Sequence, residues 1–371
     1  MKILFATRSI FPDSFGGSSR FNKNLLLELS NRKDIEITII NPIKNKHFEN
    51  IKLFKEIYIN YGENINQYSK NIDTFLKNKT FDILFSDGLS LHKCKNINGA
   101  QIIFHHHGYH MFQKQYFGKL LFESPKEFVK EFILFSFRKR AVKKFARKAD
   151  YSISLGSGIS EILKNNIGLE SNKVVEIPNA VYKTEENVSN EKIENSFLFV
   201  GSLCFRKGVS LLESALCNIS EDFKFYFVGG GPLLKRLQNK FKHNDKIEVL
   251  GRISDEELFE LYSKVECFCF PSLQEGLPTV ILEAMEKGLP IITTDIGATK
   301  DVIDNNGFLI EKGNTSSIIK AIRDFIALPE NKKIEMSRNS RRIIEQKFTW
   351  ELVTREFYKL LQKLSEGKNE K

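Results

Sequence analysis

The segment 271–290 carries the residues best suited to chemistry. It reads PSLQEGLPTVILEAMEKGLP and places two glutamates, Glu275 and Glu283, eight positions apart. Glu275 lies in a loop before Pro278, and proline is favoured at the first position of a helix. Glu283 then falls near the middle of an apolar helix, where a buried carboxylate needs polar partners. Two hydroxyls of a ribose would be suitable partners, whereas Glu283 in isolation would be a glutamate facing solvent.

Two glycine-containing loops predict an anion site. GSLCFRKG (201–208) follows a short apolar run and adds Arg206 and Lys207, and GGGP (229–232) follows the next run. Glycines let backbone amides approach an anion, which helix N-termini also favour. Each cluster alone is equally consistent with a strand-to-helix turn that uses glycine structurally. The glycines concerned are Gly201, Gly229 and Gly231.

A histidine run superficially resembles a metal site. HHHGYH (105–110) contains four of the seven histidines of the chain. In a strand, His105 and His107 would share one face and His106 would take the other. Such a run forms no closed set of ligands, and we expect no metal there. The alternative is that all of these histidines are packing or cleft-lining residues.

The elements that must position these residues alternate between short apolar runs and helical stretches. Continuous apolar strands between helices predict an α/β fold with parallel sheets covered on both faces, as in Rossmann-like domains. The expected strands of the first half are 2–7, 35–40, 81–86, 101–105, 151–155 and 173–177. Those of the second half are 197–200, 223–228, 246–250, 265–270 and 289–294.

A polar stretch predicts a linker at 184–196, which reads TEENVSNEKIENS. We therefore expect an N-terminal domain at 1–183 and a C-terminal domain at 197–347. The space between two such domains is a natural ligand cleft. The segment 348–371 has apolar residues on one helical face and is expected to return to the first domain.

Composition excludes several classes of protein. The chain has 371 residues, of which 41% are hydrophobic and 27% are charged, which is typical of globular proteins. It has no apolar run of about 18 residues, so no membrane-spanning helix is expected. The opening run contains Arg8 and no cleavage site, which favours a strand over a signal peptide. Five cysteines without metal-ligand spacing favour a reduced, cytoplasmic chain.

The motifs together resemble the retaining GT-B glycosyltransferases of the group 1, or family 4, type. The E-x7-E segment with Pro278 is the most specific part of the resemblance. The resemblance implies two Rossmann-like doubly wound domains that face each other across a cleft, with the C-terminal helix packing back on the first. The other matching motifs are Gly16-Gly17, His107-Gly108, IPNAV (177–181), GSLCFRKG, GGGP and LGRIS (250–254).

The resemblance also implies roles for residues that match these motifs. Arg206 and Lys207 would bind the diphosphate of the donor, and Glu283 would bind its ribose. Glu275 would contact the donor sugar, and His107 would face the same sugar, with His105 as the alternate histidine. The remaining donor-site residues would be Gly276 and Leu277 at the sugar, Arg252 and Ile253 at the base, and Gly16 and Gly17 at the phosphates and acceptor.

Two positions depart from the family pattern. Ser202 stands where many relatives have arginine, so Arg206 would have to supply that phosphate contact. Ala180 replaces the glycine of the usual PNG motif. Both departures leave the donor undetermined, although UDP is preferred over GDP.

The expected activity is transfer of a sugar from a nucleotide sugar to an envelope polysaccharide, lipopolysaccharide or lipid-linked acceptor. The resemblance implies retention of configuration without a metal or other cofactor. The alternatives are an epimerase or phosphorylase on the same architecture, and a sugar-nucleotide-binding protein that has lost transfer. The net charge of +10 also fits a nucleic-acid-binding protein, but no such motif appears and nucleic acid is not expected as a partner.

The segment 126–148 predicts peripheral binding to an anionic membrane, on the inner face of the cell membrane. It begins with phenylalanines and ends with seven Lys or Arg residues between Arg138 and Lys148. A basic amphipathic helix with large aromatic residues can lie in a membrane interface. The same pattern would serve a solvated helix whose phenylalanines pack on the first domain.

Overall fold

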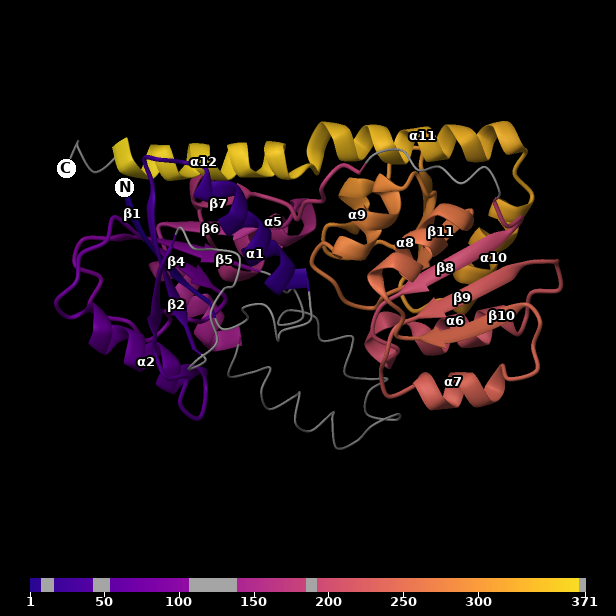
Figure 1. The fold of residues 1–371 in the computed structure, drawn as a ribbon, viewed down its shortest axis with the longest axis horizontal. Helices are drawn as coiled ribbons and strands as arrows, with labels where there is room; N and C mark the ends of the chain where they lie inside the picture. Colours follow the sequence, from indigo (N-terminus) through magenta and orange to yellow (C-terminus); the bar gives the residue numbers. More distant parts are fainter. Residues whose placement is uncertain (8–16, 43–53, 107–138, 185–191, 367–371) are drawn as a thin grey trace. The chain divides into compact units, whose positions relative to one another are not determined.

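The computed structural model describes residues 1–7, 17–42, 54–106, 139–184 and 192–366. These residues form two compact units. The first contains residues up to Asn179 and again from Trp350, and the second runs from Ala180 to Thr349. Each unit has one parallel sheet with helices packed on it (Figure 1).

The first unit contains a seven-stranded parallel sheet in the order β3-β2-β1-β4-β5-β6-β7. The order reverses between β1 and β4, which is where doubly wound sheets bind ligands beyond their carboxyl ends. Six of the strands were predicted; β3 was missed because it is a short edge strand with charged residues. The strands are β1 (Lys2–Ala6), β2 (Glu36–Asn41), β3 (Lys55–Tyr58), β4 (Ile83–Asp87), β5 (Gln101–His105), β6 (Tyr151–Ser154) and β7 (Val174–Glu176).

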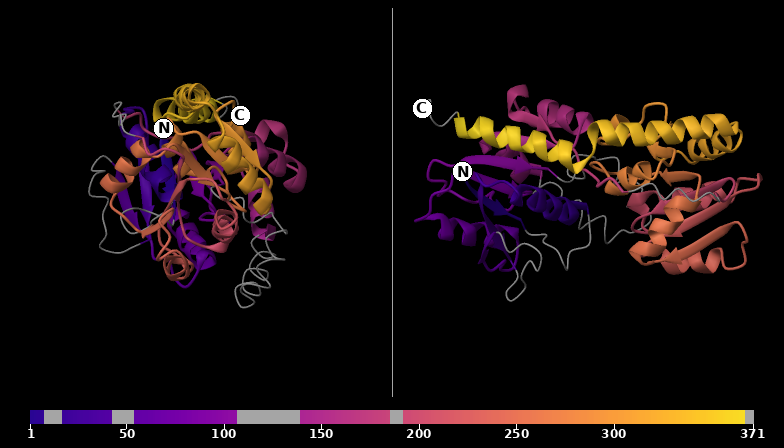
Figure 2. Two further views of the ribbon diagram at one scale, coloured as in Figure 1. Left: turned by 90° about the vertical axis from the view of Figure 1, so that its right-hand side faces the viewer. Right: turned by 45° about the horizontal axis from the view of Figure 1, so that its top comes forward.

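The C-terminal helix α12 (Trp350–Glu366) packs within the first unit, as predicted. The Trp350 ring lies 5.5 Å from that of Phe21 on α1, and the Phe357 ring lies 5.7 Å from that of Phe85 on β4. Figures 1 and 2 show α12 running beside the sheet of this unit. The unit's other labelled helices are α1 (Gly17–Ser30), α2 (Ile65–Leu76), α5 (Ser157–Ile162), η2 (Leu163–Ile167) and η3 (Ser171–Lys173).

The described half of the basic segment is a helix over 139–148 whose apolar side belongs to the core. The buried ring of Phe145 packs edge-on against that of Phe104 at 4.8 Å. Arg147 donates to the backbone oxygen of Ile167, while Arg140 and Lys144 are exposed. The phenylalanines at 128–137 lie outside the described residues. No helix in the described ranges is both long enough and apolar enough to span a bilayer.

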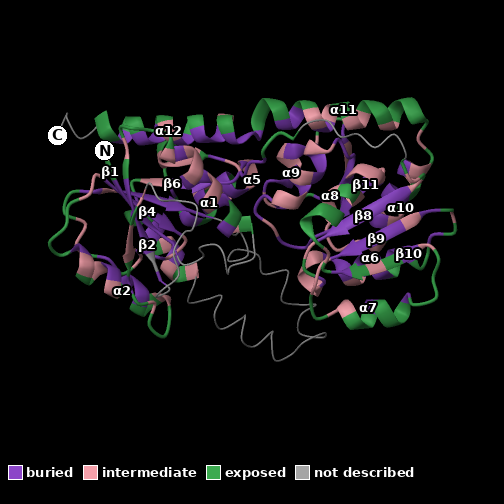
Figure 3. Cartoon of the chain, viewed as in Figure 1, coloured by how far each residue is buried: buried purple, intermediate pink, exposed green. Residues whose placement is uncertain are grey.

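The second unit contains a six-stranded parallel sheet in the order β10-β9-β8-β11-β12-β13. Its order reverses between β8 and β11. Its strands are largely buried, whereas the outer faces of its helices are exposed (Figure 3). All but β13, a short edge strand, were predicted. The strands are β8 (Ser196–Val200), β9 (Lys224–Val228), β10 (Ile247–Gly251), β11 (Cys267–Phe270), β12 (Ile291–Thr294) and β13 (Gly307–Ile310).

Local sequence accounts for several helix starts in this unit. The Ser254 hydroxyl and the Glu257 side chain form a capping box at α8, and Pro278 precedes the first residue of α9. Pro232 lies in a turn ahead of α7 and does not itself begin the helix. The helices are η4 (Phe205–Lys207), α6 (Val209–Leu216), α7 (Leu234–Lys240), α8 (Asp255–Lys264), α9 (Thr279–Glu286), η5 (Thr299–Val302), α10 (Thr315–Ile326) and α11 (Glu330–Lys347).

Candidate functional site

The candidate site lies at the carboxyl ends of β8 and β11, where the strand order of the second sheet reverses. The loop after β8 carries Arg206 and Lys207, and the loop after β11 carries Glu275. The two loops are joined by hydrogen bonds in both directions. Leu273 N donates to Arg206 O at 2.9 Å, and Arg206 Nη1 donates to Gln274 O at 3.3 Å. Residues far apart in sequence are thereby held together at the carboxyl ends of these two central strands.

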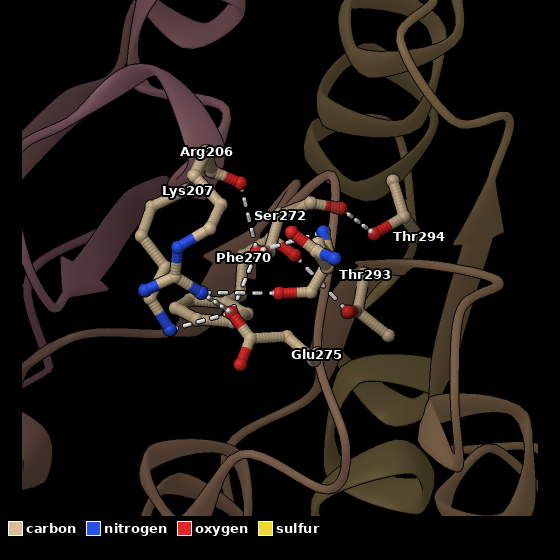
Figure 4. Close-up of polar contacts among 8 residues, drawn as sticks. Arg206, Lys207, Phe270, Ser272, Glu275, Thr293 and Thr294 are labelled. Atoms are coloured by element: carbon tan, nitrogen blue, oxygen red, sulfur yellow. Dashed lines mark hydrogen bonds and ion pairs between the residues drawn. The ribbon is translucent and has the colours of Figure 1, made fainter. Parts of the chain in front are cut away.

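Glu275 is the counter-ion of both cations (Figure 4). Its Oε1 atom lies 2.5 Å from Lys207 Nζ and 3.9 Å from Arg206 Nη1. The buried Ser272 hydroxyl lies 2.6 Å from the same oxygen and donates to it. The side chains of Lys207 and Glu275 are only 16% and 10% exposed, so solvent screens their attraction weakly. The site thus offers two cations for an anion and a carboxylate that can accept from hydroxyl groups.

The loop that carries Glu275 is fixed from its other side by residues after β12. Thr294 Oγ1 donates to Ser272 O at 2.5 Å, and Ala298 N donates to Gly276 O at 2.9 Å. At Gly297, φ is +59° and a Cβ atom would lie 2.4 Å from Glu275 O. Only glycine fits this close approach, so the position of Glu275 depends on the turn after β12.

The glycine loops after β8 and β9 interlock. Gly201 N donates to Val228 O at 3.0 Å, and a Cβ atom at Gly229 would lie 1.9 Å from Gly201 O. Gly231 lies in the same turn, beside Leu203. Gly229 is therefore required for the packing of these two loops, as expected if the glycines serve the strand-to-helix turns. This packing fixes the shape of the loop that carries Arg206 and Lys207.

The other residues of this unit that were predicted to bind the donor lie in loops at the carboxyl ends of the strands or on α9. Arg252 and Ile253 connect β10 to α8, and the exposed Arg252 side chain lies beside Gly230. Gly276 and Leu277 are buried between Glu275 and the start of α9. Glu283 is half-buried on α9. Arg206, Lys207 and Glu275 are thus in mutual contact, and Arg252 lies next to the glycine loop.

Of the residues predicted in the first unit, Gly17 is described as the first residue of α1, whereas Gly16 and His107 lie outside the described residues. The alternate histidine, His105, is wholly buried at the end of β5. Its ring packs 4.6 Å from that of Phe21 and 5.7 Å from that of Phe85. His105 therefore packs in the core of this unit, and the histidine role at the donor sugar stays a prediction for His107.

A buried polar cluster in the first unit was not predicted. Asp87 Oδ2, at the end of β4, accepts from Thr7 Oγ1 at 2.5 Å and from Asn22 Nδ2 at 2.9 Å. The hydroxyl of Tyr68 donates to Thr7 O, and burial together with the Asp87 charge raises the pKa of Tyr68. The cluster joins β1 to β4 where that sheet reverses its order. The available signal was an aspartate directly after the apolar run FDILFS.

Among the described residues, no group of three or more His, Cys, Asp or Glu side chains is arranged to hold a metal ion.

Comparisons with known proteins match the part of the sequence that contains this site, and the fold. Residues 194–327, which contain the candidate site, match the family model of glycosyl transferases group 1. The chain is 32% identical over 213 residues to an uncharacterized glycosyltransferase of Methanocaldococcus jannaschii, covering 56% of this chain and 59% of that one. It is 30% identical over 146 residues to the O-antigen biosynthesis glycosyltransferase WbnH of Escherichia coli, covering 39% and 42%. The matched part spans about half the length of these relatives.

Among solved structures, Anabaena HepE in complex with UDP-glucose superimposes with a TM-score of 0.69. The sequences are 16% identical, and the match covers 98% of this chain and all of HepE (100%). At 16% sequence identity, the similarity to HepE is evidence for a shared fold alone. The chain has the GT-B fold, with two parallel α/β Rossmann-like sheets and a C-terminal helical region.

Proposed function

We propose that this protein is a glycosyltransferase that moves a sugar from a nucleotide-sugar donor to a glycan or lipid-linked acceptor. The observation that carries the proposal is the contact of Arg206 and Lys207 with Glu275 at the strand-order reversal. The match of residues 194–327 to the group 1 model supports it, because that range contains all three residues.

The leaving group determines what the cations do. When the anomeric bond breaks, the sugar becomes oxocarbenium-like and negative charge grows on the departing diphosphate. Arg206 and Lys207 stabilise that charge without a metal, and fixed donors of this kind act more strongly in the transition state than in the ground state. Glu275 accepts hydrogen bonds from sugar hydroxyls, His107 also acts on the donor sugar, and the transfer retains the anomeric configuration.

The second unit takes the donor in this proposal, and the first takes the acceptor. Glu283 binds the ribose, Arg252 and Ile253 lie beside the base, and UDP is preferred over GDP. The structure of HepE with UDP-glucose supports this preference by analogy of fold. The O-antigen relative WbnH supports an acceptor among envelope polysaccharides or lipopolysaccharides.

The proposed place of action is the cytoplasm, with peripheral binding to the inner face of the cell membrane. The exposed side chains of Arg140 and Lys144 support this part of the proposal, since anionic lipid attracts basic residues near its surface. The apolar contribution would have to come from residues before 139, because Phe145 is in the core.

A panel of UDP- and GDP-sugars tests the proposal. The donor raises the melting temperature, because a ligand that binds only the native state stabilises it by mass action. Nucleotide release from that donor is slow and accelerates with a suitable glycan acceptor. Isomerised donor would indicate an epimerase, and binding without turnover under any acceptor would indicate a sugar-nucleotide-binding protein. Stabilisation by none of the panel would refute the proposal.

A further inference from the structure

One carboxylate oxygen of Glu275 occupies the position that a bound anion would take between Lys207 and Arg206. Oε1 lies within ion-pair distance of Lys207 Nζ and Arg206 Nη1, and it accepts from Ser272 Oγ. A phosphate that binds Lys207 must therefore either replace this oxygen or lie beside a largely buried carboxylate of the same charge, which repels it. The bound anion and Glu275 compete for the same cations.

We infer that Glu275 is a specificity-determining residue that favours a nucleotide sugar over a bare diphosphate. The inference rests on the proposed function for the identity of the preferred ligand. Its central step, competition between Glu275 and a diphosphate, concerns this chain's own residues and can be tested with inorganic pyrophosphate.

The Glu275 carboxylate has little freedom to move with Lys207 or to rotate into solvent. Its side chain is 10% exposed, and its loop is fixed by Thr294 on Ser272 and by the close approach of Gly297. When a diphosphate binds Lys207 and Arg206 in place of the carboxylate, Glu275 keeps the Ser272 hydroxyl but loses both charged partners. A buried charge without its partner is costly, so a bare diphosphate binds at a penalty.

A sugar attached to the diphosphate removes that penalty. Its hydroxyl groups are donors, and a hydrogen bond to a carboxylate is stronger than one between neutral groups. A ligand that carries both the anion and hydroxyl donors next to it replaces both halves of the Lys207–Glu275 pair. The product diphosphate replaces only one half, so the same residue favours donor binding and product release.

The chain contains a matched control at the opposite end of the same strand. Glu266 directly precedes β11 and pairs with Lys333 at 2.9 Å, with side chains 13% and 11% exposed. Its burial and partner type match those of Glu275, but it lies at the amino end of the strand. Glu266→Gln removes a comparable ion pair without touching the proposed anion site.

The first experiment measures pyrophosphate affinity by isothermal titration calorimetry in the presence of EDTA. Glu275→Gln is expected to bind pyrophosphate about tenfold more tightly than wild type, because the competing charge is gone. Glu266→Gln is expected to bind as wild type does. Glu275→Ala removes the same charge, so it is expected to shift affinity in the same direction and serves if the Gln variant does not fold. Unchanged or weaker binding by folded Glu275 variants overturns the inference.

The second experiment compares UDP with whichever UDP-sugar stabilises wild type most. Wild type is expected to prefer the UDP-sugar, and Glu275→Gln is expected to lose about a factor of ten of that preference. Equal preference in both proteins overturns the specificity role. Failure of the proposed function looks different: wild type then binds no nucleotide sugar, while the pyrophosphate result still tests the competition.

Discussion

Among single side chains, Lys207 is the strongest test of the anion site. It is nearly buried, contacts Glu275 at 2.5 Å and lies 5.0 Å above the ring of Phe270. Lys207→Ala is expected to lower turnover on the order of 10²–10³-fold, as for the loss of one preorganised donor to developing charge. The measurement is kcat at saturating nucleotide sugar, with folding checked by circular dichroism.

Arg206→Ala should have an effect of similar size if Arg206 supplies the contact that arginine makes at the position of Ser202 in relatives. Arg206 also donates to Gln274 O and thereby joins the two loops. Turnover close to wild type in both single variants, with the fold intact, would refute the phosphate assignment.

Glu283 tests the ribose assignment separately from the leaving group. Ribose contacts are alike in the ground and transition states, so Glu283→Ala is expected to raise KM far more than it lowers kcat. Glu286→Gln is the control, because Glu286 lies on the same helix but accepts from Thr184. Wild-type affinity of Glu283→Ala for the free nucleotide would show that the ribose role is wrong.

Sequence motifs predicted the cations and Glu275 but not their supports. Ser272, Thr294 and Gly297 act through loops after β11 and β12, and their contacts arise only when the strands align in the sheet. The Thr7–Asp87 contact likewise joins residues 80 positions apart. The burial of His105 has a similar cause, because strand alternation separates two faces but His105 and His106, on opposite faces, are both buried.

At the scale of elements, continuous apolar runs predicted the central strands because parallel strands covered on both faces must be apolar throughout. Of the four edge strands, β7 and β10 were predicted and β3 and β13 were missed, because a strand with only one neighbour needs less burial and its apolar pattern is a weaker signal. The helix at 139–148 shows the limit of amphipathic patterns. Its apolar side packs on Phe104, a use that the sequence does not distinguish from membrane binding.

Because the apolar side of the helix at 139–148 is buried, only its exposed basic side chains are available to contact a membrane. Wild type is expected to co-sediment with vesicles containing anionic lipid at low salt and to be released by added salt, because exposed charges are screened. Reversal of Arg140 and Lys144 to Glu should weaken binding while leaving donor affinity intact, since about 1 kcal/mol is expected per basic residue near the surface. Wild type that stays in the supernatant at low salt would favour a soluble acceptor.

At the scale of the whole molecule, the reactivity of the five cysteines can be used to test whether the cores of both units are folded. Cys94 lies in the first unit, and Cys267 and Cys269 lie on β11 in the second. Burial raises the pKa of Cys94 to about 12, and it raises the pKa values of Cys267 and Cys269 as well. The thiolate is the reactive form, so these three thiols are doubly protected at pH 8, by low ionisation and by lack of access.

We therefore expect a thiol reagent at pH 8 to modify the exposed Cys217 rapidly and the half-buried Cys204 more slowly. The three buried thiols should react only after denaturant unfolds the unit that contains them, which the labelled peptides identify by mass spectrometry. Cys204 lies in the loop that carries Arg206 and Lys207, so pyrophosphate is expected to slow its modification and to leave Cys217 unaffected. Reaction of Cys267 or Cys269 in the native protein as fast as Cys217 would contradict the buried sheet core.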